Sequence, residues 1–409
     1  MYSAGAMIWL EQPTKLGPLV AQARQVGRNV LRPIARKYDR AEHVYPKELD
    51  MLAAMLRAVG ERGSTAVGLD KRRSDAASAR DAREDGARNG ANLATVIAFA
   101  ELCWGDLGLA LTLPGQGLGN AAVSAVATPE QLARFGGRWA AMAITEPGAG
   151  SDSANIRTTA RLDGDEWVID GEKIFVTAGS RAETVVVWAT LDRAQGRAAI
   201  KPFVVPRGTP GMEVVRLDEK LGIRASDTAT LSFRGCRIPK DNLLGSPEIR
   251  ARGGFAGVMQ TFDNTRPVVA AMALGVGRAA LERTEALLRV GPDVGGHPLG
   301  GSAVQAALSK MRADLEAARL LTLQAAFLGD NREPNAVQAS MAKAKAARVA
   351  GAITLRCVEL AGSAGYGEDE LLEKWARDSK ILDIFEGTQQ IQLLIIARRL
   401  LGKSSRELK

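Results

Sequence analysis

The first third of the chain carries hydrophobic residues at helical spacing. Alanine and leucine are dense in residues 1–125, and apolar positions recur three and four residues apart. One such series comprises Leu49, Leu52, Ala53, Leu56 and Val59. The stretch from Lys71 to Gly90 is strongly charged and has no apolar stripe, so we expect it to be exposed. Helical spacing returns at Leu93–Leu113, and we predict an all-helical N-terminal domain over residues 1–138.

From about Ala140 the pattern changes to short runs of β-branched and aromatic residues separated by turn residues. The expected strands are Ile156–Leu162, Glu166–Ile169, Glu172–Thr177, Thr184–Leu191, Pro202–Val205, Met212–Leu217 and Ala229–Phe233. The first three are separated by Asp163-Gly164-Asp165 and by Asp170-Gly171, and Asp-Gly pairs are typical of hairpin turns. We predict a middle β domain over residues 139–246.

Long helical patterns dominate again from Gly253 onwards. One apolar stripe comprises Val304, Ala307, Leu308, Met311 and Leu315. Another helix is expected over Val337–Leu360, and several long helices with short connections favour a C-terminal bundle over residues 247–409. The order helices, strands, helices predicts an α+β fold and excludes a doubly wound sheet. No Gly-x-Gly-x-x-Gly follows a predicted strand, so a Rossmann cofactor site is not supported.

The composition is that of a globular protein. The chain has 409 residues, of which 46% are hydrophobic and 24% charged, and this length predicts two or three domains. It contains no uncharged apolar run of about 18 residues that would predict a transmembrane helix. The first residues lack the basic start and long apolar centre of a secretory signal. The cysteines Cys103, Cys236 and Cys357 lie far apart, which favours reduced thiols and a cytoplasmic location.

Charge and histidine content narrow the possible chemistry. The net charge of +8 favours anionic ligands, including phosphates, but only 5% of residues are aromatic and no nucleic-acid-binding module occurs. His43 and His297 are the two histidines, and they stand in unrelated contexts. A histidine-based triad or a metal site with several imidazoles is therefore not expected. The chemistry must come from carboxylates or from a cofactor.

One carboxylate near the C-terminus stands at a predicted helix junction. Glu386 follows the apolar segment Ile381–Phe385, and a second helix is expected from about Gln389. Gly387 is a candidate for the end of the first helix, and Thr388 for the N-cap of the second. The apolar face of the second helix comprises Ile391, Leu394 and Ile395.

Such a junction can hold a partly buried carboxylate whose pKa is raised by desolvation, as the base that deprotonates a carbon acid requires. The alternative interpretation of Glu386 is a helix-end charge that contributes up to about 1 kcal/mol of stability and nothing else. The residues of this stretch alone favour that alternative.

A second candidate is the glycine-rich segment Ala143-Ile-Thr-Glu-Pro-Gly-Ala-Gly-Ser-Asp152. Gly148 and Gly150 permit close approach of the main chain, so that amide groups and the Ser151 hydroxyl can face a ligand. Taken alone, the segment is more typical of a plain turn.

With these segments in order, the sequence resembles the acyl-CoA dehydrogenase family, flavoproteins that desaturate acyl-CoA thioesters between Cα and Cβ. The resemblance extends over nearly the whole chain and rests on Ile144-Thr-Glu-Pro-Gly-Ala-Gly-Ser-Asp152, Lys220-Leu-Gly-Ile-Arg-Ala-Ser-Asp227, Phe262-Asp-Asn-Thr-Arg-Pro267 and the region from Lys380 to Arg399 around Phe385-Glu-Gly-Thr388. It implies a helical N-terminal domain, a middle β domain and a C-terminal four-helix bundle, with FAD between the last two.

The resemblance also implies roles for individual residues. Glu386 matches the catalytic base, which takes the α-proton while the β-hydride passes to flavin N5. The implied FAD-binding residues are Met142, Ile144, Thr145, Gly150, Ser151, Phe175, Thr177, Gly362, Thr388 and Gln390. The implied substrate-binding residues are Ser151, Asp263, Arg266 and Gly387. Electrons are expected to pass to an electron-transferring flavoprotein.

Single residues argue against two variants of the family. Some members place the base just before the arginine that matches Arg266, but Thr265 occupies that position here and cannot serve. Nitroalkane-oxidising relatives use aspartate at the catalytic position, and Glu386 argues against that activity. An acyl-CoA oxidase is a lesser variant that the reaction of the reduced enzyme with oxygen would decide.

The match breaks at two motifs that hold FAD. The family's Arg-x-x-Phe-Gly is replaced by Arg289-Val-Gly-Pro-Asp-Val-Gly-Gly-His-Pro-Leu299, and its Gln-x-x-Gly-Gly-x-Gly by Glu359-Leu-Ala-Gly-Ser-Ala-Gly365. Either FAD is held by altered contacts in a homo-oligomer, or a paralogous partner subunit supplies the missing contacts. The alternative function is thus a non-catalytic or half-site subunit of a hetero-oligomeric acyl-CoA dehydrogenase. The acyl chain length cannot be deduced from these motifs.

Overall fold

The computed structural model describes residues 13–52, 90–115, 117–249, 256–290 and 302–404, together with residue 407. Within the long helices, the side chains of residues 256–261, 263, 264, 289, 290 and 302 lie outside this description. Most of the charged stretch from Lys71 to Gly90 and most of the altered segment after Arg289 also lie outside it.

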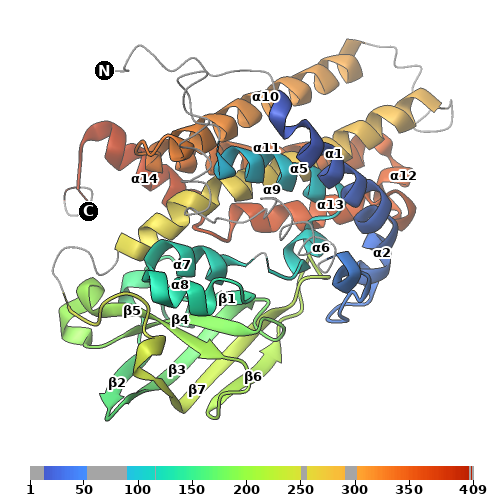
Figure 1. Ribbon diagram of the computed structural model, residues 1–409. Helices are drawn as coiled ribbons and strands as arrows, with labels where there is room; N and C mark the ends of the chain where they lie inside the picture. Colours follow the sequence, from blue (N-terminus) through green and yellow to red (C-terminus); the bar gives the residue numbers. More distant parts are fainter. Residues whose placement is uncertain are drawn as a thin grey trace. The chain divides into compact units, whose positions relative to one another are not determined.

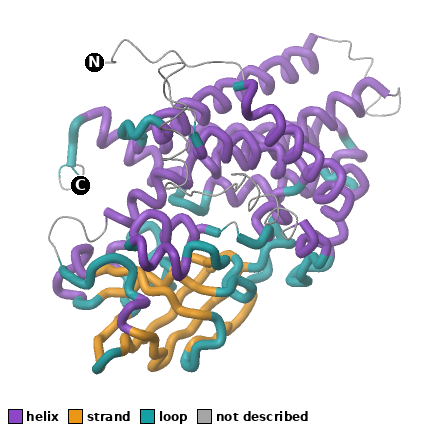
Figure 2. The backbone as a smooth tube through the Cα atoms, in the orientation of Figure 1, coloured by secondary structure: helices purple, strands orange, loops and turns teal. Residues whose placement is uncertain are grey.

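The chain forms two compact units that group residues differently from the three predicted domains. The helical unit contains the described residues of 1–36, 74–110 and 266–409, and the sheet unit contains those of 37–73 and 111–265. The architecture is α+β, as predicted, with helices purple and strands orange in Figure 2. The three domain boundaries stay predictions.

The helical unit is built from long helices, which Figure 1 labels. Its helices are α1 (Gly17–Val26), α5 (Ala91–Gly105), α9 (Ala256–Val290), α10 (Ser302–Asp330), α11 (Ala336–Ala361), α12 (Ser363–Tyr366), α13 (Leu372–Ser379) and α14 (Gln389–Leu401), and α9 begins within the sheet unit. A π-helical turn, η2 (Gly27–Leu31), joins α1 to α2 (Arg32–Arg40). Helix α11 packs against α10, α13 and α14.

The apolar stripe predicted over residues 304–315 is confirmed. In α10, Val304, Leu308 and Met311 are buried, and Ala307 and Leu315 are partly buried on the same face. The predicted helix Val337–Leu360 corresponds closely to α11. The Leu93–Leu113 segment forms α5 and the short helix α6 (Leu107–Thr112), which extends into the sheet unit.

The sheet unit contains one seven-stranded sheet. Its strands are β1 (Ala140–Ala143), β2 (Thr159–Asp163), β3 (Glu166–Thr177), β4 (Thr184–Thr190), β5 (Ile200–Pro206), β6 (Met212–Leu217) and β7 (Thr228–Pro239). The strand order is β1-β4-β2-β3-β7-β6, and β5 pairs with β4. Helices α7 (Leu118–Val126) and α8 (Pro129–Phe135) share an apolar cluster with β1, β4 and β5.

One strand prediction is wrong. Asp163-Gly164-Asp165 does form the turn between antiparallel β2 and β3, but Asp170-Gly171 makes no hairpin. It lies inside the continuous strand β3, where the register against β7 shifts between Ile169 and Gly171. A Cβ on Gly171 would approach the Thr158 Oγ1 to 2.4 Å, and its φ is +152°. Glycine is therefore required here by a bulge and a close neighbour.

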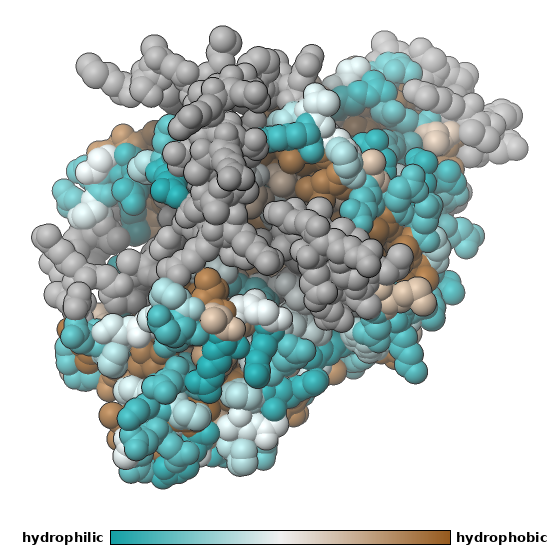
Figure 3. All heavy atoms as spheres, in the orientation of Figure 1, coloured by the Kyte–Doolittle hydropathy of each residue, from teal (hydrophilic) through white to brown (hydrophobic). Residues whose placement is uncertain are grey.

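The outer strand β6 is largely exposed, and hydrophilic residues cover much of the face of the sheet unit that Figure 3 shows. Buried residues of the sheet form the apolar core, which includes Trp167, Phe203 and Phe233. Among the helices that the structure describes, none combines the length and hydrophobicity that crossing a bilayer requires.

Candidate active site

The predicted base, Glu386, lies in a strained turn between two helical segments. Helix α13 continues into a short 3-10 helix, η7 (Lys380–Asp383), and α14 begins after the N-cap Thr388. Glu386 has a left-handed φ of +56°, and Gly387 has a φ of +88°. A side chain with a Cβ in this region is disfavoured, and such strain is concentrated at functional sites.

The N-cap prediction is confirmed, because the Thr388 Oγ1 accepts a hydrogen bond from the Ile391 amide at 3.3 Å. The expectation that Gly387 ends the preceding helix is wrong. That helix ends at Asp383, and Gly387 is the second of two consecutive residues with positive φ. The apolar residues Ile384 and Phe385 thus belong to the turn.

Two buried side chains hold the main chain of this turn. The Lys343 Nζ in α11 donates to the Gly387 carbonyl oxygen at 2.7 Å. The Gln392 Nε2 in α14 donates to the carbonyl oxygens of Glu386 and Gly387, each at 3.1 Å. Lys343 and Gln392 are fully buried. The turn is therefore fixed through its carbonyl groups, while the half-buried Glu386 side chain takes no part in these hydrogen bonds.

The Lys343 ammonium lies among charged neighbours. Burial lowers its pKa to about 8 despite the opposing effect of the Asp383 and Glu386 carboxylates, and Arg266 lowers it further. Desolvation thus outweighs the attraction of two anions. Two predicted site residues, Glu386 and Arg266, therefore both lie near enough to Lys343 to shift its pKa.

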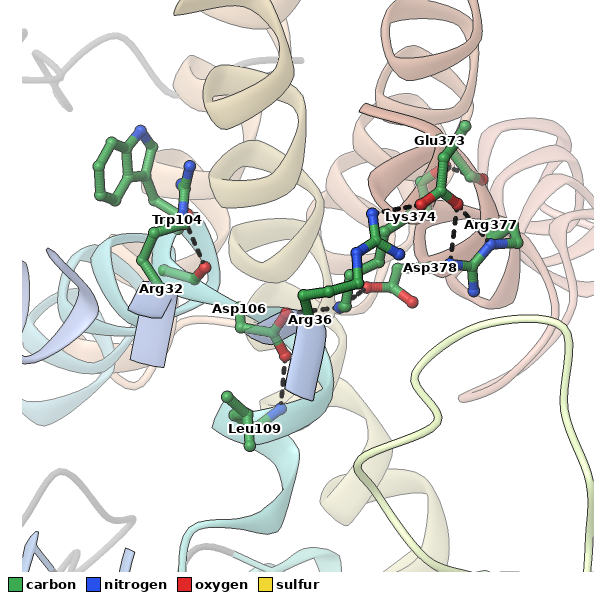
Figure 4. Close-up of polar contacts among 12 residues, drawn as sticks. Arg32, Arg36, Trp104, Asp106, Leu109, Glu373, Lys374, Arg377 and Asp378 are labelled. Carbon is green, nitrogen blue, oxygen red and sulfur yellow. Dashed lines mark hydrogen bonds and ion pairs between the residues drawn. The ribbon is translucent and has the colours of Figure 1, made fainter. Parts of the chain in front are cut away.

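A second cluster of buried charges anchors α13, the helix that leads into η7. The Lys374 Nζ lies 2.5 Å from Oδ2 of both Asp106 and Asp378, and all three side chains have 0% exposure. The Leu109 amide donates to Oδ1 of Asp106 at 2.8 Å. Figure 4 shows this cluster with Arg32 and Arg36 of α2 drawn nearby. The cluster fixes the start of the segment that carries Glu386.

The protonation of this cluster follows from its charges. Burial raises the pKa of Asp106 against the attraction of Lys374, and the second carboxylate, Asp378, adds to the rise. The pKa of Lys374 is raised, because its two carboxylate partners outweigh its burial. The lysine therefore stays protonated between them.

Of the two predicted substrate-binding residues on α9, the structure describes the side chain of only one. Arg266 is buried, with 3% exposure, and the side chain of Asp263 lies outside the described residues. Thr265 is also buried, and its hydroxyl donates to the Phe262 carbonyl at 3.4 Å. A threonine hydroxyl held in this way is no general base, which agrees with the expectation that Thr265 cannot replace Glu386.

Gly362 lies where α11 ends, with a φ of +58°. A Cβ placed on it would meet no atom within 4 Å, so its main chain is open on that side. Glu359, which departs from the family's glutamine, is half exposed and paired with Arg356 at 2.5 Å. The ion pair offsets the negative charge that would repel a phosphate group. Gln390 is exposed at the start of α14.

In the sheet unit, the predicted residues Met142, Ile144 and Thr145 lie at the end of β1 and just beyond it. Met142 and Ile144 are buried, and Thr145 is partly buried. The Thr145 carbonyl accepts a hydrogen bond from the Ile174 amide at 2.9 Å, which ties this segment to β3.

A buried ion pair supports the same segment. The Lys173 Nζ donates to the Ile144 carbonyl at 3.1 Å and to the Glu146 Oε1 at 2.7 Å. Glu146 also accepts hydrogen bonds from the amides of Arg157 and Thr158. Burial lowers the pKa of Lys173 to about 8 against the attraction of Glu146. Burial alone would raise the pKa of Glu146, but Lys173 and the amides bring it below its ordinary value.

The glycine-rich loop after this pair is open. Gly148, Gly150 and Ser151 are exposed, and a Cβ on either glycine would meet no atom within 4 Å. The loop itself is a tight turn, because Glu146 and Ala149 exchange two main-chain hydrogen bonds of 3.2 and 3.0 Å. Because its two exposed glycines carry no side chain, a ligand can approach the main chain of this turn closely.

Phe175 has a positive φ of +57° and an exposure of 61%. The Phe175 ring therefore does not belong to the apolar core of the sheet. Thr177, two residues on, is partly buried. After it, the Asp227 carbonyl accepts from the Ala178 amide, and the Asp227 carboxylate accepts from the Ser180 amide and hydroxyl. Asp227, at the end of a family-like segment, thus holds the chain that follows Phe175.

The buried residues that support the site are not among the residues predicted from the sequence. Lys343 is separated by three, four or seven positions from the buried residues Ala339, Ala346, Ala347 and Ala350, so a lysine on the buried helical face was a detectable signal. Lys173 and Glu146 gave no such signal, because their pairing depends on how β3 lies beside the loop after β1.

Comparison with known proteins agrees with this architecture. Residues 141–236 match the acyl-CoA dehydrogenase middle domain, and residues 252–401 match the acyl-CoA dehydrogenase C-terminal domain. The mitochondrial short-chain specific acyl-CoA dehydrogenase of Bos taurus is 36% identical over 401 residues, which cover 96% of this chain and 91% of that relative.

Solved structures agree as well. Butyryl-CoA dehydrogenase from Megasphaera elsdenii has a TM-score of 0.83 at 29% identity, covering 97% of this chain and 100% of that one. A structure described as the electron transferring flavoprotein of Acidaminococcus fermentans has a TM-score of 0.83 at 30% identity, covering 96% of this chain and 100% of that one.

The chain belongs to the acyl-CoA dehydrogenase family. Its members are FAD-dependent flavoproteins, and this protein is an FAD-dependent enzyme that dehydrogenates acyl-CoA. The residues present fit that cofactor. In the sheet unit, Phe175 presents an exposed aromatic face on strained main chain, and the exposed Gly148 and Gly150 carry no side chain that would keep a ligand from the main chain.

Proposed function

We propose that this enzyme forms the trans-2-enoyl-CoA from a saturated acyl-CoA, with Glu386 as the base that removes the α-proton. The observation that carries the proposal is the half-buried Glu386 carboxylate on a strained turn whose carbonyl groups are fixed by Lys343 and Gln392. A base that acts on a weak carbon acid must be held in place and partly desolvated.

The chemistry of the substrate defines what the protein must do. The α-hydrogen next to a thioester is only weakly acidic, so a base must act while negative charge on the carbonyl oxygen is stabilised. Glu386 takes the α-proton, the Cα–H electron pair becomes the new double bond, and the β-hydrogen leaves with its own electron pair. When bound, FAD supplies the acceptor for that hydride.

We assign the remaining residues to two groups of contacts. Ser151, Asp263, Arg266 and Gly387 are proposed to bind the acyl-CoA, and the Arg266 guanidinium suits an anionic group. The proposed FAD contacts are Met142, Ile144, Thr145, Gly150, Ser151, Phe175, Thr177, Gly362, Thr388 and Gln390. The open glycines and the exposed ring of Phe175 support the cofactor assignment.

We propose a short-chain acyl group and an electron-transferring flavoprotein as the acceptor of the electrons. The similarity to a short-chain specific enzyme and to butyryl-CoA dehydrogenase supports the first, and the structural similarity to the Acidaminococcus fermentans protein supports the second. A reducing compartment, the cytoplasm, is supported by three buried cysteines that form no disulfide.

The test is anaerobic bleaching of the flavin absorbance with acyl-CoA thioesters of increasing length, beginning at the four-carbon acyl group. Glu386→Gln is expected to slow bleaching by about 10²- to 10⁴-fold while retaining bound flavin, because the base is lost and the shape is kept. Glu316→Gln, which alters an exposed carboxylate of α10 paired with Arg319, is the matched control and leaves the rate unchanged.

Equal bleaching by the Glu386→Gln and unaltered enzymes would contradict the role of Glu386. The native mass of the same sample decides the oligomer. A protein that stays colourless with added FAD, and turns yellow only with a paralogous subunit, would favour the half-site subunit of a hetero-oligomer over a self-sufficient homo-oligomer.

A further inference from the structure

Lys343 occupies a position that a lysine fills only at a cost. Its side chain has 0% exposure, and it lies on the alanine-rich face of α11 that packs against other helices. An isolated buried ammonium is unfavourable, and an apolar residue of similar volume is usually at least as stable. Stability of the fold alone therefore does not account for a lysine at this position.

The contacts of Lys343 lead to the catalytic turn. Its Nζ donates to the carbonyl of Gly387, the residue that follows Glu386, at 2.7 Å. Gln392 donates to the same carbonyl and to that of Glu386. Two donors from different helices thus converge on one peptide unit, and α14 is joined again to α11 by a hydrogen bond of 3.2 Å from Gln389 to the Ala344 carbonyl.

We propose that Lys343 is a positioning residue for Glu386: through the Gly387 carbonyl it fixes the turn that aims the carboxylate, and its charge favours the ionised base. This inference rests on the proposed role of Glu386. The positive φ of Glu386 is disfavoured for a residue with a Cβ, and the hydrogen bonds from Lys343 and Gln392 hold the turn that imposes it.

The charges around Lys343 determine how this position responds to pH. Among the described side chains, the charged groups that act on it are Asp383 of η7, Glu386 of the turn and Arg266 of α9. Asp383 is itself near the cations Arg348, at 3.8 Å, and Lys380, at 3.9 Å. The Lys343 charge acts on both carboxylates, on Asp383 more strongly than on Glu386. The Lys343 pKa near 8 means that this charge is present at neutral pH and is lost above it.

The experiment separates geometry from charge with three variants of the flavin-loaded enzyme. Lys343→Met removes the hydrogen bond and the charge, Gln392→Met removes two hydrogen bonds and keeps the charge, and Lys343→Arg keeps the charge. Lys345→Met is the matched control, because Lys345 is two residues along α11 and pairs with Asp314 at 2.9 Å.

Two readouts are used for each variant. The first is flavin bleaching by the acyl-CoA as a function of pH. The second is deuterium exchange at the α-carbon of an acyl-CoA that carries sulfur in place of the β-carbon, followed by mass spectrometry. That analogue has acidic α-hydrogens but no β-hydrogen to transfer, so its exchange reports the base without the redox step.

Lys343→Met is expected to slow both processes by about 10- to 100-fold, since a displacement of about 1 Å costs up to that much, with the KM little changed. The acidic limb of its pH profile should move to higher pH by on the order of one unit, because a cation beside the carboxylate is lost. Gln392→Met should slow exchange without moving the limb, Lys343→Arg should restore the limb, and Lys345→Met should match the unaltered enzyme.

Folded, flavin-loaded Lys343→Met with an unchanged exchange rate and an unchanged acidic limb would overturn the inference. If Lys343→Met does not fold, Gln392→Met decides, and unchanged exchange in that variant overturns the positioning role. If the unaltered enzyme and Glu386→Gln exchange at the same rate, the proposed function itself fails. Fast exchange that depends on Glu386 but not on Lys343 or Gln392 removes only this inference.

Discussion

Lys173 in the sheet unit and Lys343 in the helical unit are both fully buried, and each donates to a carbonyl beside predicted site residues. They differ in their counter-ions. Lys173 lies 2.7 Å from Glu146, a buried carboxylate that also accepts hydrogen bonds from two main-chain amides. Lys343 acts at longer range on Asp383 and on the half-buried Glu386.

The difference shows how a buried lysine can serve two purposes. We call the Lys173–Glu146 pair closed, because both charged groups are buried and each neutralises the other. Its role is to fix the shape of the glycine-rich loop. The Lys343 charge acts on the Glu386 carboxylate, which makes none of the three hydrogen bonds that Lys343 and Gln392 donate to the turn. A compensated pair stabilises a shape, whereas an incompletely compensated charge can tune a reactive group.

The largest effect is expected from breaking the closed pair. Lys173→Met leaves the Glu146 carboxylate buried without its cation, and we expect the free energy of unfolding to fall by about 3–5 kcal/mol. Urea denaturation measures this change. Lys240→Met, which removes an exposed pair with Asp165, is the control and should change stability by less than about 1 kcal/mol. A Lys173→Met protein as stable as the control would show that the pair is not closed.

Lys343→Met should change the free energy of unfolding in the opposite direction at neutral pH. The folded pKa of Lys343, about 8, lies below the ordinary value of 10.5, so the unfolded chain binds the proton more tightly between these values. The stability of the unaltered protein relative to Lys343→Met should therefore rise as pH increases from about 8 to 10.5. Below pH 8 the variant should be the more stable by on the order of 1–3 kcal/mol.

Thermal or urea unfolding at pH 7, 9 and 10.5 measures that difference, with Lys345→Met as the control that should show no such trend. A stability difference that does not change with pH would mean that Lys343 keeps its ordinary pKa in the folded protein.

The smallest effect on stability is expected at two helix N-caps, one in each unit. Thr388→Ala and Thr128→Ala each remove a side-chain acceptor at a helix N-terminus and should each cost about 1 kcal/mol in unfolding free energy. Only Thr388→Ala should also slow flavin bleaching, because Thr388 follows the Glu386–Gly387 turn directly. Equal rates in the two variants would show that α14 does not need its cap to aim Glu386.

The sequence alone predicted the features that depend on neighbouring residues. The apolar stripe of α10, the extent of α11, the strand Met212–Leu217 and the N-cap Thr388 follow from local spacing and local hydrogen bonding. Four ordered segments, including those around Gly148 and Glu386, carried the family resemblance, and family membership is confirmed.

The tertiary structure decided what depends on residues far apart in the chain. Asp170-Gly171 is a typical hairpin pair, but pairing of β3 with β7 and the close approach of Thr158 make it a bulge. Lys173 donates to Glu146, which is 27 positions away in the sequence, and Lys343 donates to the Gly387 carbonyl, which is 44 positions away. No local pattern specifies such contacts, because burial and a partner's position set the cost of a buried charge. The sequence therefore indicated Glu386, and the packing of α11 and α14 determined what holds it.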